Sequence, residues 1–279
     1  MKKLTSLVLV LLMIASLAVT VFANADGNKW GDIPLYKGEI KLDGKIDEIY
    51  LQGLAVKIDK RTDGTTGGAT GTAYLLWGNN KLYLAVDVVD PKIVPVDASQ
   101  SVFKNEAIEF IVDFLNNGNT KNACKIMVGA QDNRMEIRYG ATETYAKSVS
   151  VMSDKGYVIE VVCDLSQQTF TSPKAGENYG INIVIDDVTE PGVVTAVSPT
   201  HKNSPATNEA KKYDYATLSD KEVKVEAATT KPAETTKPAA QTQKPASSTT
   251  APATFDAFAV IAVVAAASLG GVVVSKKRK

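Results

Sequence analysis

The sequence contains few of the residues on which most enzyme sites depend. It has one histidine, His201, and two cysteines in 279 residues. Ser–His–Asp and Cys–His arrangements need a positioned histidine, and no second residue pattern supports one around His201. Zinc sites need a cluster of cysteine or histidine ligands, which this sequence does not offer. We therefore expect a protein that is not an enzyme.

An excess of charge of either sign is also absent. The chain has 31 basic and 31 acidic residues, so its formal net charge is zero. Partners such as nucleic acid are attracted by a strong positive field, and we expect no nucleic-acid partner. The glycine-rich segment 63–68 is not followed by the Gly-Lys-Ser/Thr sequence of a phosphate-binding loop, so we interpret it as a surface loop.

Both ends of the chain carry apolar runs. Lys2 and Lys3 precede an apolar run over 4–22, and the small residues at 23–25 form a pattern that signal peptidase reads. We therefore expect residues 1–25 to be a signal peptide and the protein to be exported. A second run, at 257–274, is long enough to cross a bilayer and precedes four basic residues. This predicts a transmembrane helix at 255–279 with a cytoplasmic tail, which leaves the folded part on the extracellular face.

The segment 225–254 reads as a linker. It is rich in Ala, Thr, Pro and Lys, and Thr229-Thr230-Lys231-Pro232-Ala233 recurs six residues later. Such a composition cannot bury enough apolar surface to fold and favours an extended spacer. Ala251-Pro252-Ala253-Thr254 resembles the Pro-x-Thr sorting signals of Gram-positive surface proteins. It has Ala251 where leucine is usual and Phe255 where glycine is usual, so attachment to the cell wall as well as the membrane stays open.

The remaining residues, 26–224, show strand patterns. Residues 73–77 and 81–90 flank the turn Gly78-Asn79-Asn80, which is typical of a β-hairpin. In 107–114, apolar residues alternate with Glu109 and Asp113, as in a strand with one buried face. We predict an all-β fold of one domain, a two-sheet antiparallel β-sandwich of the jelly-roll-like kind.

Several motifs follow one another in a distinctive order. They are Leu42-Asp43-Gly44-Lys45-Ile46-Asp47, Leu75-Leu76-Trp77, Asp87-Val88-Val89-Asp90, Glu106-Ala107-Ile108-Glu109-Phe110 and Gly156-Tyr157-Val158-Ile159-Glu160. This order resembles that of family 9 carbohydrate-binding modules, which are related to the DOMON-like superfamily, over about 40–218. The resemblance implies a non-catalytic cell-surface protein that recognises polysaccharide or oligosaccharide through its β-sandwich.

The resemblance also implies a set of ligand-binding residues. Phe103 lies where members of the family stack an aromatic ring on sugar, and Glu109 can accept hydrogen bonds from sugar hydroxyls. Lys125 and Arg138 lie on strands that supply polar contacts. Trp77 is a further aromatic candidate, although it shares a strand face with Leu75, which favours the core. For the others, a loop residue folded on the core or a solvated strand face stays an alternative.

Two further sites are suggested by local sequence. Asp186, Asp187 and Glu190 cluster at a strand end and could bind calcium in a structural role, although solvation of a loop end also explains them. Cys124 and Cys163 lie in predicted strands, where a disulfide or two small buried hydrophobic residues are both consistent with the sequence.

Other functions stay open because the family's second aromatic wall is missing: no aromatic occurs in 195–201. The domain could be a protein-interaction or structural module of a surface assembly. It could also be an extracellular haem-binding domain with Met127 and either His201 or Lys202 as axial ligands.

Overall fold

The computed structural model describes residues 27–120, 123–138, 145–167, 172–200 and 213–225. Contacts divide the chain into a unit at 1–229 and a second at 230–279. The expected signal peptide, most of the expected linker and the expected transmembrane helix lie outside the described residues. Within the described ranges, no helix is long and apolar enough to cross a membrane.

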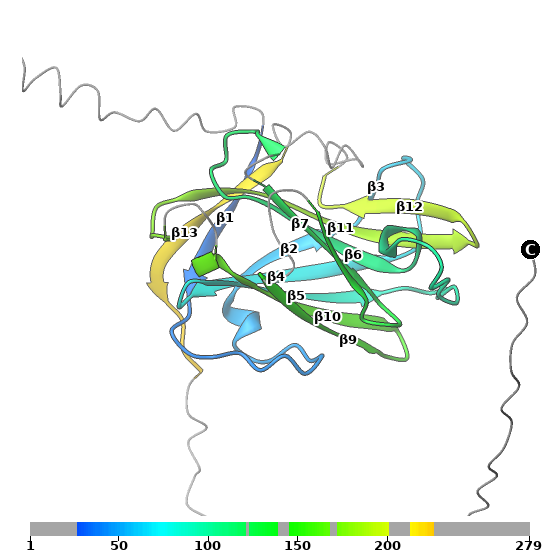
Figure 1. The fold of residues 1–279 in the computed structure, drawn as a ribbon, viewed down its shortest axis with the longest axis horizontal. Helices are drawn as coiled ribbons and strands as arrows, with labels where there is room; N and C mark the ends of the chain where they lie inside the picture. The colour runs from blue at the N-terminus through cyan, green and yellow to red at the C-terminus, as the bar shows by residue number, and fades with distance from the viewer. Residues whose placement is uncertain (1–26, 121–122, 139–144, 168–171, 201–212, 226–279) are drawn as a thin grey trace, which may run out of the picture. The chain divides into compact units, whose positions relative to one another are not determined.

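The described residues form thirteen strands and short 3-10 helices (Figure 1). The strands are β1 (Lys29–Leu35), β2 (Leu54–Ile58), β3 (Lys60–Arg61), β4 (Thr70–Gly78), β5 (Lys81–Val89), β6 (Ala107–Asp113), β7 (Ala123–Gly129), β8 (Met135–Arg138), β9 (Ala146–Met152), β10 (Gly156–Asp164), β11 (Asn178–Glu190), β12 (Val193–Ser198) and β13 (Asp214–Glu222). The 3-10 helices are η1 (Tyr50–Gln52), η2 (Val102–Lys104) and η4 (Leu165–Gln167). The predicted all-β class is confirmed.

The strands belong to one continuous sheet that folds over into two layers. Its hydrogen-bonded order is β8-β7-β6-β11-β13-β1-β4-β5-β10-β9, with β12 beside β11 and β2 beside β4. The expectation of two separate antiparallel sheets needs one correction. β1 pairs in parallel with both β13 and β4, so it joins the layers. The two ends of the path, β8 and β9, lie at the open side of the sandwich.

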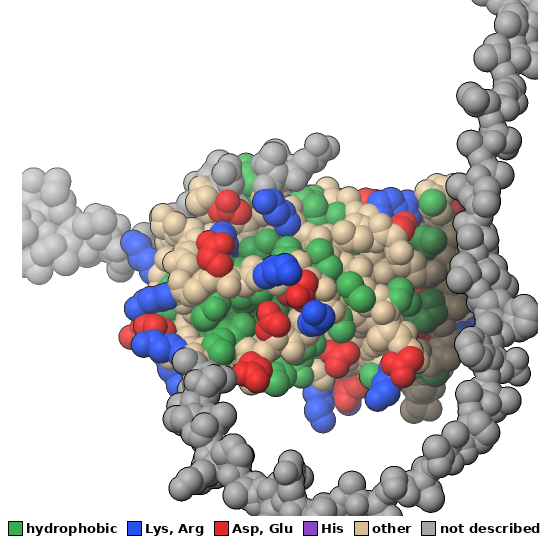
Figure 2. Space-filling model, turned by 90° about the horizontal axis from the view of Figure 1, so that it is seen from below, with side chains coloured by type: hydrophobic (Ala, Val, Ile, Leu, Met, Phe, Trp, Pro, Cys, Tyr) green, Lys and Arg blue, Asp and Glu red, His purple; other side chains and the backbone are tan. Residues whose placement is uncertain are grey.

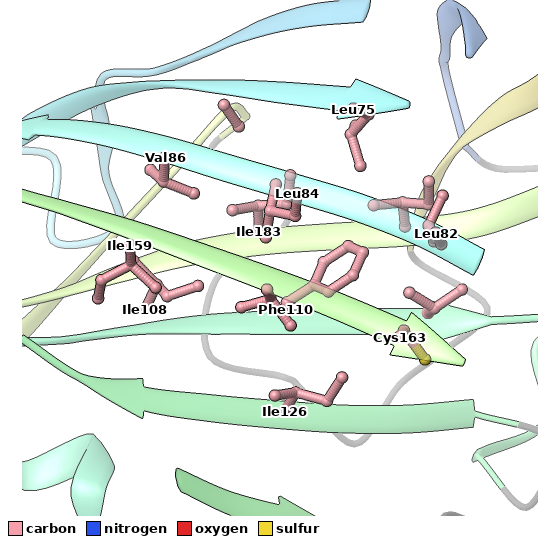
Figure 3. Packing of buried hydrophobic residues seen from close by; sticks show 14 of the residues in the cluster. Leu75, Leu82, Leu84, Val86, Ile108, Phe110, Ile126, Ile159, Cys163 and Ile183 are labelled. Atoms are coloured by element: carbon pink, nitrogen blue, oxygen red, sulfur yellow. The ribbon is translucent and has the colours of Figure 1, made fainter. Parts of the chain in front are cut away.

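The core lies between the layers and follows the alternation read from the sequence. Leu82, Leu84 and Val86 of β5 point inward, as do Phe110 and the alternate residues Ile108 and Val112 of β6, and all are fully buried. Figure 3 shows these side chains meeting between the layers. Burial of each large apolar side chain contributes about 1.5–3 kcal/mol. The outer side of β6 is buried too, because all seven of its residues are inaccessible, and this feature positions the site described below.

The turn of the β4–β5 hairpin has the conformation that its residues favour. Asn79 and Asn80 have φ values of 50° and 56°. Asparagine tolerates this left-handed region better than most residues, and two consecutive positive φ values match the twist of a tight hairpin. The turn fixes the register in which Leu75 lies opposite Leu84, so the apolar faces of both strands reach the core together.

The loop that carries the Asp43-Gly44 motif is held by a buried carboxyl on β10. Glu160 Oε2 accepts hydrogen bonds from the backbone N–H of Asp43 at 2.8 Å and of Gly44 at 2.5 Å. Gly44 has a φ of +77°, and a Cβ there would meet the Val151 side chain at 2.1 Å. Only glycine suits this position. Burial raises the pKa of Glu160, although the two N–H donors partly offset that effect.

Candidate functional site

A buried ion pair lies on the outer side of β6 and β7. Glu109 and Lys125 are 4% and 5% exposed, and Lys125 Nζ lies 2.6 Å from Glu109 Oε1. Taking two charges out of water costs several kcal/mol, and their attraction repays this cost only at short range and good geometry. Such a pair contributes little net stability, so we consider these two charged residues as candidates for ligand recognition.

Asp186 of β11 faces the same side as this pair. β11 pairs with β6, and Asp186 lies opposite Ala107. Burial raises the pKa of Asp186 well above its ordinary value; the charge of Glu109 raises it further, and Lys125 and Lys104 act against this. Its Oδ2 is buried without a hydrogen-bond partner among the described residues. Burial favours the neutral form of this carboxyl, which can donate a hydrogen bond as well as accept one.

Phe103 lies at the margin of these polar residues. It is half-buried and packs on a small apolar cluster that includes Ala107 and Met127. Met127 lies directly opposite Glu109 in the β6–β7 register, so the ring is close to the ion pair. Lys104 Nζ lies 5.0 Å from the ring centroid. An aromatic ring and several charged groups therefore gather within one region.

Arg138 completes this region from β8. It lies directly opposite Lys125, and its Cζ is 5.3 Å from the Phe103 ring centroid. Its Nη2 donates to Ser101 Oγ at 2.9 Å and to Glu136 Oε2 at 3.0 Å. We call Phe103, Glu109, Lys125, Arg138 and Asp186 the polar face. Four of these five residues were predicted as ligand-binding, and the structure brings those four together.

The structure places Trp77, the fifth ligand-binding candidate, in the core instead. It is 7% exposed and belongs to the main hydrophobic cluster. Its indole N–H donates to the Ser219 carbonyl at 2.8 Å. Because the ring is enclosed and its polar atom is satisfied, Trp77 has no face to present to a ligand. Its assignment to the ligand site was wrong, and the apolar alternation of β4 explains its position.

The predicted calcium ligands do not form one group. Asp186 and Asp187 are consecutive strand residues, so their side chains point to opposite sides of β11, and Glu190 is exposed at the strand end. Asp187 instead lies with Asp90 and Glu106: one carboxylate oxygen of each falls within 4.8 Å of the others, and all three residues are buried. The expected grouping of Asp186, Asp187 and Glu190 is therefore wrong, and of these three only Asp187 belongs to the acidic group in the structure.

Three buried carboxyl groups share this acidic cluster of Asp90, Glu106 and Asp187. Arg61 forms an ion pair with Asp187. From the backbone, Glu106 accepts long hydrogen bonds, from Val188 N at 3.3 Å and Val94 N at 3.4 Å. Burial, followed by the charge of Asp90, raises the pKa of Glu106 to about 8, and burial likewise raises the pKa of Asp90.

Two buried oxygens beside the acidic cluster lack hydrogen-bond partners in the described structure. They are Asp90 Oδ2 and the Tyr157 hydroxyl. Burial raises the pKa of Tyr157 well above its usual value, and Glu106 is the first of the charges that add to this effect. Calcium takes six to eight oxygen ligands, chiefly carboxylates and carbonyls. The donor set of the acidic cluster therefore fits a hard divalent cation.

The haem alternative has little support from the described residues. Met127 is fully buried in the cluster beneath Phe103, as expected of a packing residue. His201 and Lys202, its suggested partners, lie outside the described residues.

The family model for "Carbohydrate family 9 binding domain-like" proteins matches residues 42–221, more than half of the chain. The chain belongs to this family. Exoglucanase XynX of Acetivibrio thermocellus is 25% identical over 189 residues, which cover 60% of this chain and 16% of that protein. Endo-1,4-beta-xylanase A of Thermoanaerobacterium saccharolyticum is 22% identical over 191 residues, with 62% and 16% covered. The chain thus spans about one sixth of these relatives.

A solved structure shares the fold of this family member. The family 9 carbohydrate-binding module of Caldicellulosiruptor kristjanssonii, in complex with cellotriose, superposes with a TM-score of 0.59 at 15% identity. The match covers 68% of this chain and 94% of the other. At that identity the likeness establishes the sandwich architecture, and ligand recognition has to be argued from the side chains of this chain.

Proposed function

We propose that this protein is a non-catalytic carbohydrate-binding module that recognises polysaccharide or oligosaccharide through the polar face. One observation carries the proposal: the buried Glu109–Lys125 pair and the Asp186 carboxyl, whose pKa burial raises, lie beside the half-buried ring of Phe103. Carbohydrate sites combine an aromatic surface with a few fixed polar groups, and all of these are contributed by strands or by η2.

Each part of the polar face has a role in holding a sugar ring. The apolar C–H groups of a pyranose pack on the Phe103 ring. Glu109 accepts hydrogen bonds from sugar hydroxyls, and Lys125 donates to a hydroxyl oxygen. Asp186 in its protonated form donates one more. Because these polar groups are already desolvated, a sugar that satisfies them is favoured over one that leaves them unpaired.

The chemistry of the relatives suggests the ligand class. The matched relatives are named as an exoglucanase and an endo-1,4-beta-xylanase, and the structural neighbour is in complex with cellotriose. We infer β-linked gluco- and xylo-oligosaccharides as the first ligands to test. Neutral glycans also suit the zero formal net charge of the chain, and on the face that Figure 2 shows, acidic and basic side chains are interspersed.

The test is calorimetric titration with cellotriose and xylotriose. Phe103→Ala should weaken binding, whereas Tyr74→Ala should not, because Tyr74 is a half-buried aromatic residue on the other layer. Equal loss in both variants would point to general destabilisation. Absence of binding by the unmodified protein to any glucan or xylan, with retention of a protein from the cell envelope, would favour the protein-interaction alternative.

We also propose that the acidic cluster holds a structural calcium ion. The three carboxylates would share the ion, whose charge would offset their mutual repulsion. It would tie the loop after β5 to β6 and β11. Calorimetric titration of CaCl₂ into protein that a chelator has freed of calcium tests this. Glu106→Gln should lose calcium binding. Glu190→Gln, which is altered at an exposed carboxylate, is the control and should keep it.

We further propose that the protein is exported and tethered at its C-terminus. The lysines before the apolar run at 4–22 and the basic residues after 257–274 support this reading. Extracellular placement also suits a polysaccharide binder. Protease treatment of intact cells should remove the domain while a basic C-terminal fragment stays with the membrane. Recovery of that fragment covalently joined to the cell wall would instead show wall attachment.

A further inference from the structure

The two cysteines of the chain lie together inside the sandwich. Cys124 is on β7 and Cys163 is on β10, and they are 1% and 0% exposed within the same core cluster. Both thiols are free in this structure, and the neighbouring Cys124 thiol is the leading cause that raises the pKa of Cys163. Figure 3 shows the Cys163 sulfur directed toward the strand that carries Ile126. Cys124 precedes Ile126 by two residues and therefore shares its face.

The two cysteines lie on strands close to the two ends of the hydrogen-bonded sheet. The hydrogen-bonded path starts at β8 and ends at β9, so these two strands flank the open side of the sandwich. β7 and β10 are each one strand in from an end. We propose that Cys124 and Cys163 form a disulfide that joins the two layers covalently at this open side.

The chemistry needs an oxidant, for which we name a small-molecule disulfide such as oxidised glutathione. The thiolate of one cysteine attacks a sulfur of that disulfide and releases one glutathione thiolate, which takes up a proton. The second cysteine, as its thiolate, then attacks the cysteinyl sulfur of the mixed disulfide and releases the other glutathione thiolate. Two cysteine thiols are oxidised to one disulfide, and one glutathione disulfide is reduced to two thiols.

The burial of the pair determines when this reaction can occur. The hydrogen bond with Cys124, followed by burial, raises the pKa of Cys163 well above its usual value. The attacking thiolate is therefore scarce in the folded protein, and the oxidant has no access to the core. Oxidation accordingly takes place as the layers assemble, in an oxidising compartment or refolding buffer, and the folded reduced protein reacts slowly.

Refolding of the full chain in detergent tests the proposal. The chain is denatured, reduced, refolded with a glutathione redox couple, denatured again and alkylated. We expect no alkylated cysteine, a mass lower by two hydrogen atoms than that of the reduced protein, and a peptide that links 124 to 163. The closed loop of about 40 residues should raise the Tm by about 10 °C over the reduced form.

Matched variants make the outcome decisive. Cys124→Ala should leave one alkylated thiol and show no redox-dependent Tm, and Cys163→Ala should behave in the same way. Two alkylated thiols in the refolded unmodified chain, under conditions that close the disulfides of a reference protein such as ribonuclease A, would overturn the proposal. So would stable glutathione adducts in place of the link. The result is independent of carbohydrate binding.

Discussion

Replacement of Lys125 by methionine tests whether the ion pair of the polar face is buried as described. Methionine keeps the length and apolar stem of lysine but removes its charge. The Glu109 carboxylate, 4% exposed and 2.6 Å from the lost ammonium, is then left buried without its ion-pair partner. Removal of one partner of a buried pair destabilises a protein by about 3–5 kcal/mol. We expect Lys125→Met to lower the free energy of unfolding by an amount in this range.

The second half of the test is a double-mutant cycle. In Glu109→Gln/Lys125→Met neither charge remains, and replacement of a whole buried pair is often neutral or stabilising. The double variant should therefore be more stable than Lys125→Met alone. The difference between the sum of the single losses and the loss in the double variant gives the coupling energy, which we expect to be several kcal/mol.

Urea unfolding followed by tryptophan fluorescence provides the measurement. With a denaturant slope of about 2 kcal/mol per molar, a loss of 3–5 kcal/mol lowers the midpoint by roughly 2 M. Lys147→Met is the control, because Lys147 is exposed on β9. If Lys125→Met and Lys147→Met shift the midpoint equally and by less than about 0.5 M, the pair is not buried and the description of the polar face is refuted.

Three other predictions follow from the structure. Phe103→Ala should weaken oligosaccharide binding by about two- to tenfold, because one aromatic contact contributes about 0.5–1.5 kcal/mol; unchanged affinity by calorimetry would remove Phe103 from the site. With a chelator present, the contribution of Glu106 to stability should be greatest at acid pH. It should fall as the pH rises from 4.5, the ordinary pKa of glutamate, through about 8, because the pKa of Glu106 is raised in the folded state. Calcium should flatten this dependence of Tm on pH, and an identical profile with and without calcium would argue against the site. With calcium present, the raised pKa of Glu160 should make the unmodified protein lose stability relative to Glu160→Gln as the pH rises above 4.5. Glu160→Ala should be less stable than Glu160→Gln by about 1–3 kcal/mol at every pH, because two buried N–H donors lose their acceptor. Parallel pH profiles for all three proteins would contradict this.

Much of the fold could be read from the sequence because its signals are local. The alternation in 107–114 and the asparagines at the 78–80 turn depend on neighbouring residues alone, and both predictions are confirmed. The parallel contacts of β1 with β13 and β4 could not be read in the same way. The first joins segments almost 190 residues apart, such as Lys29 and Tyr215, and the second joins Leu35 to Trp77; no short-range pattern encodes either.

The site could be predicted only in part, because its contacts also depend on pairing between distant segments. Glu109 and Lys125 were named individually, but their contact depends on the register that sets Met127 opposite Glu109, and a shift of one residue would move a side chain to the other face. The acidic cluster gathers residues 90, 106 and 187 from three separate segments. Its one sequence signal was the position of Asp90 just after one strand and of Glu106 just before the next.

Chemical-shift mapping of the ¹⁵N-labelled domain during titration with cellotriose and xylotriose tests the central proposal most directly. We predict that the amide shifts change in a saturable way at Phe103, Glu109, Lys125, Arg138 and Asp186 and at their strand neighbours, while the outer side of β9 and β10 stays unchanged. Shift changes confined to another surface, or none at saturating oligosaccharide, would contradict the assignment of the polar face as the carbohydrate-binding site.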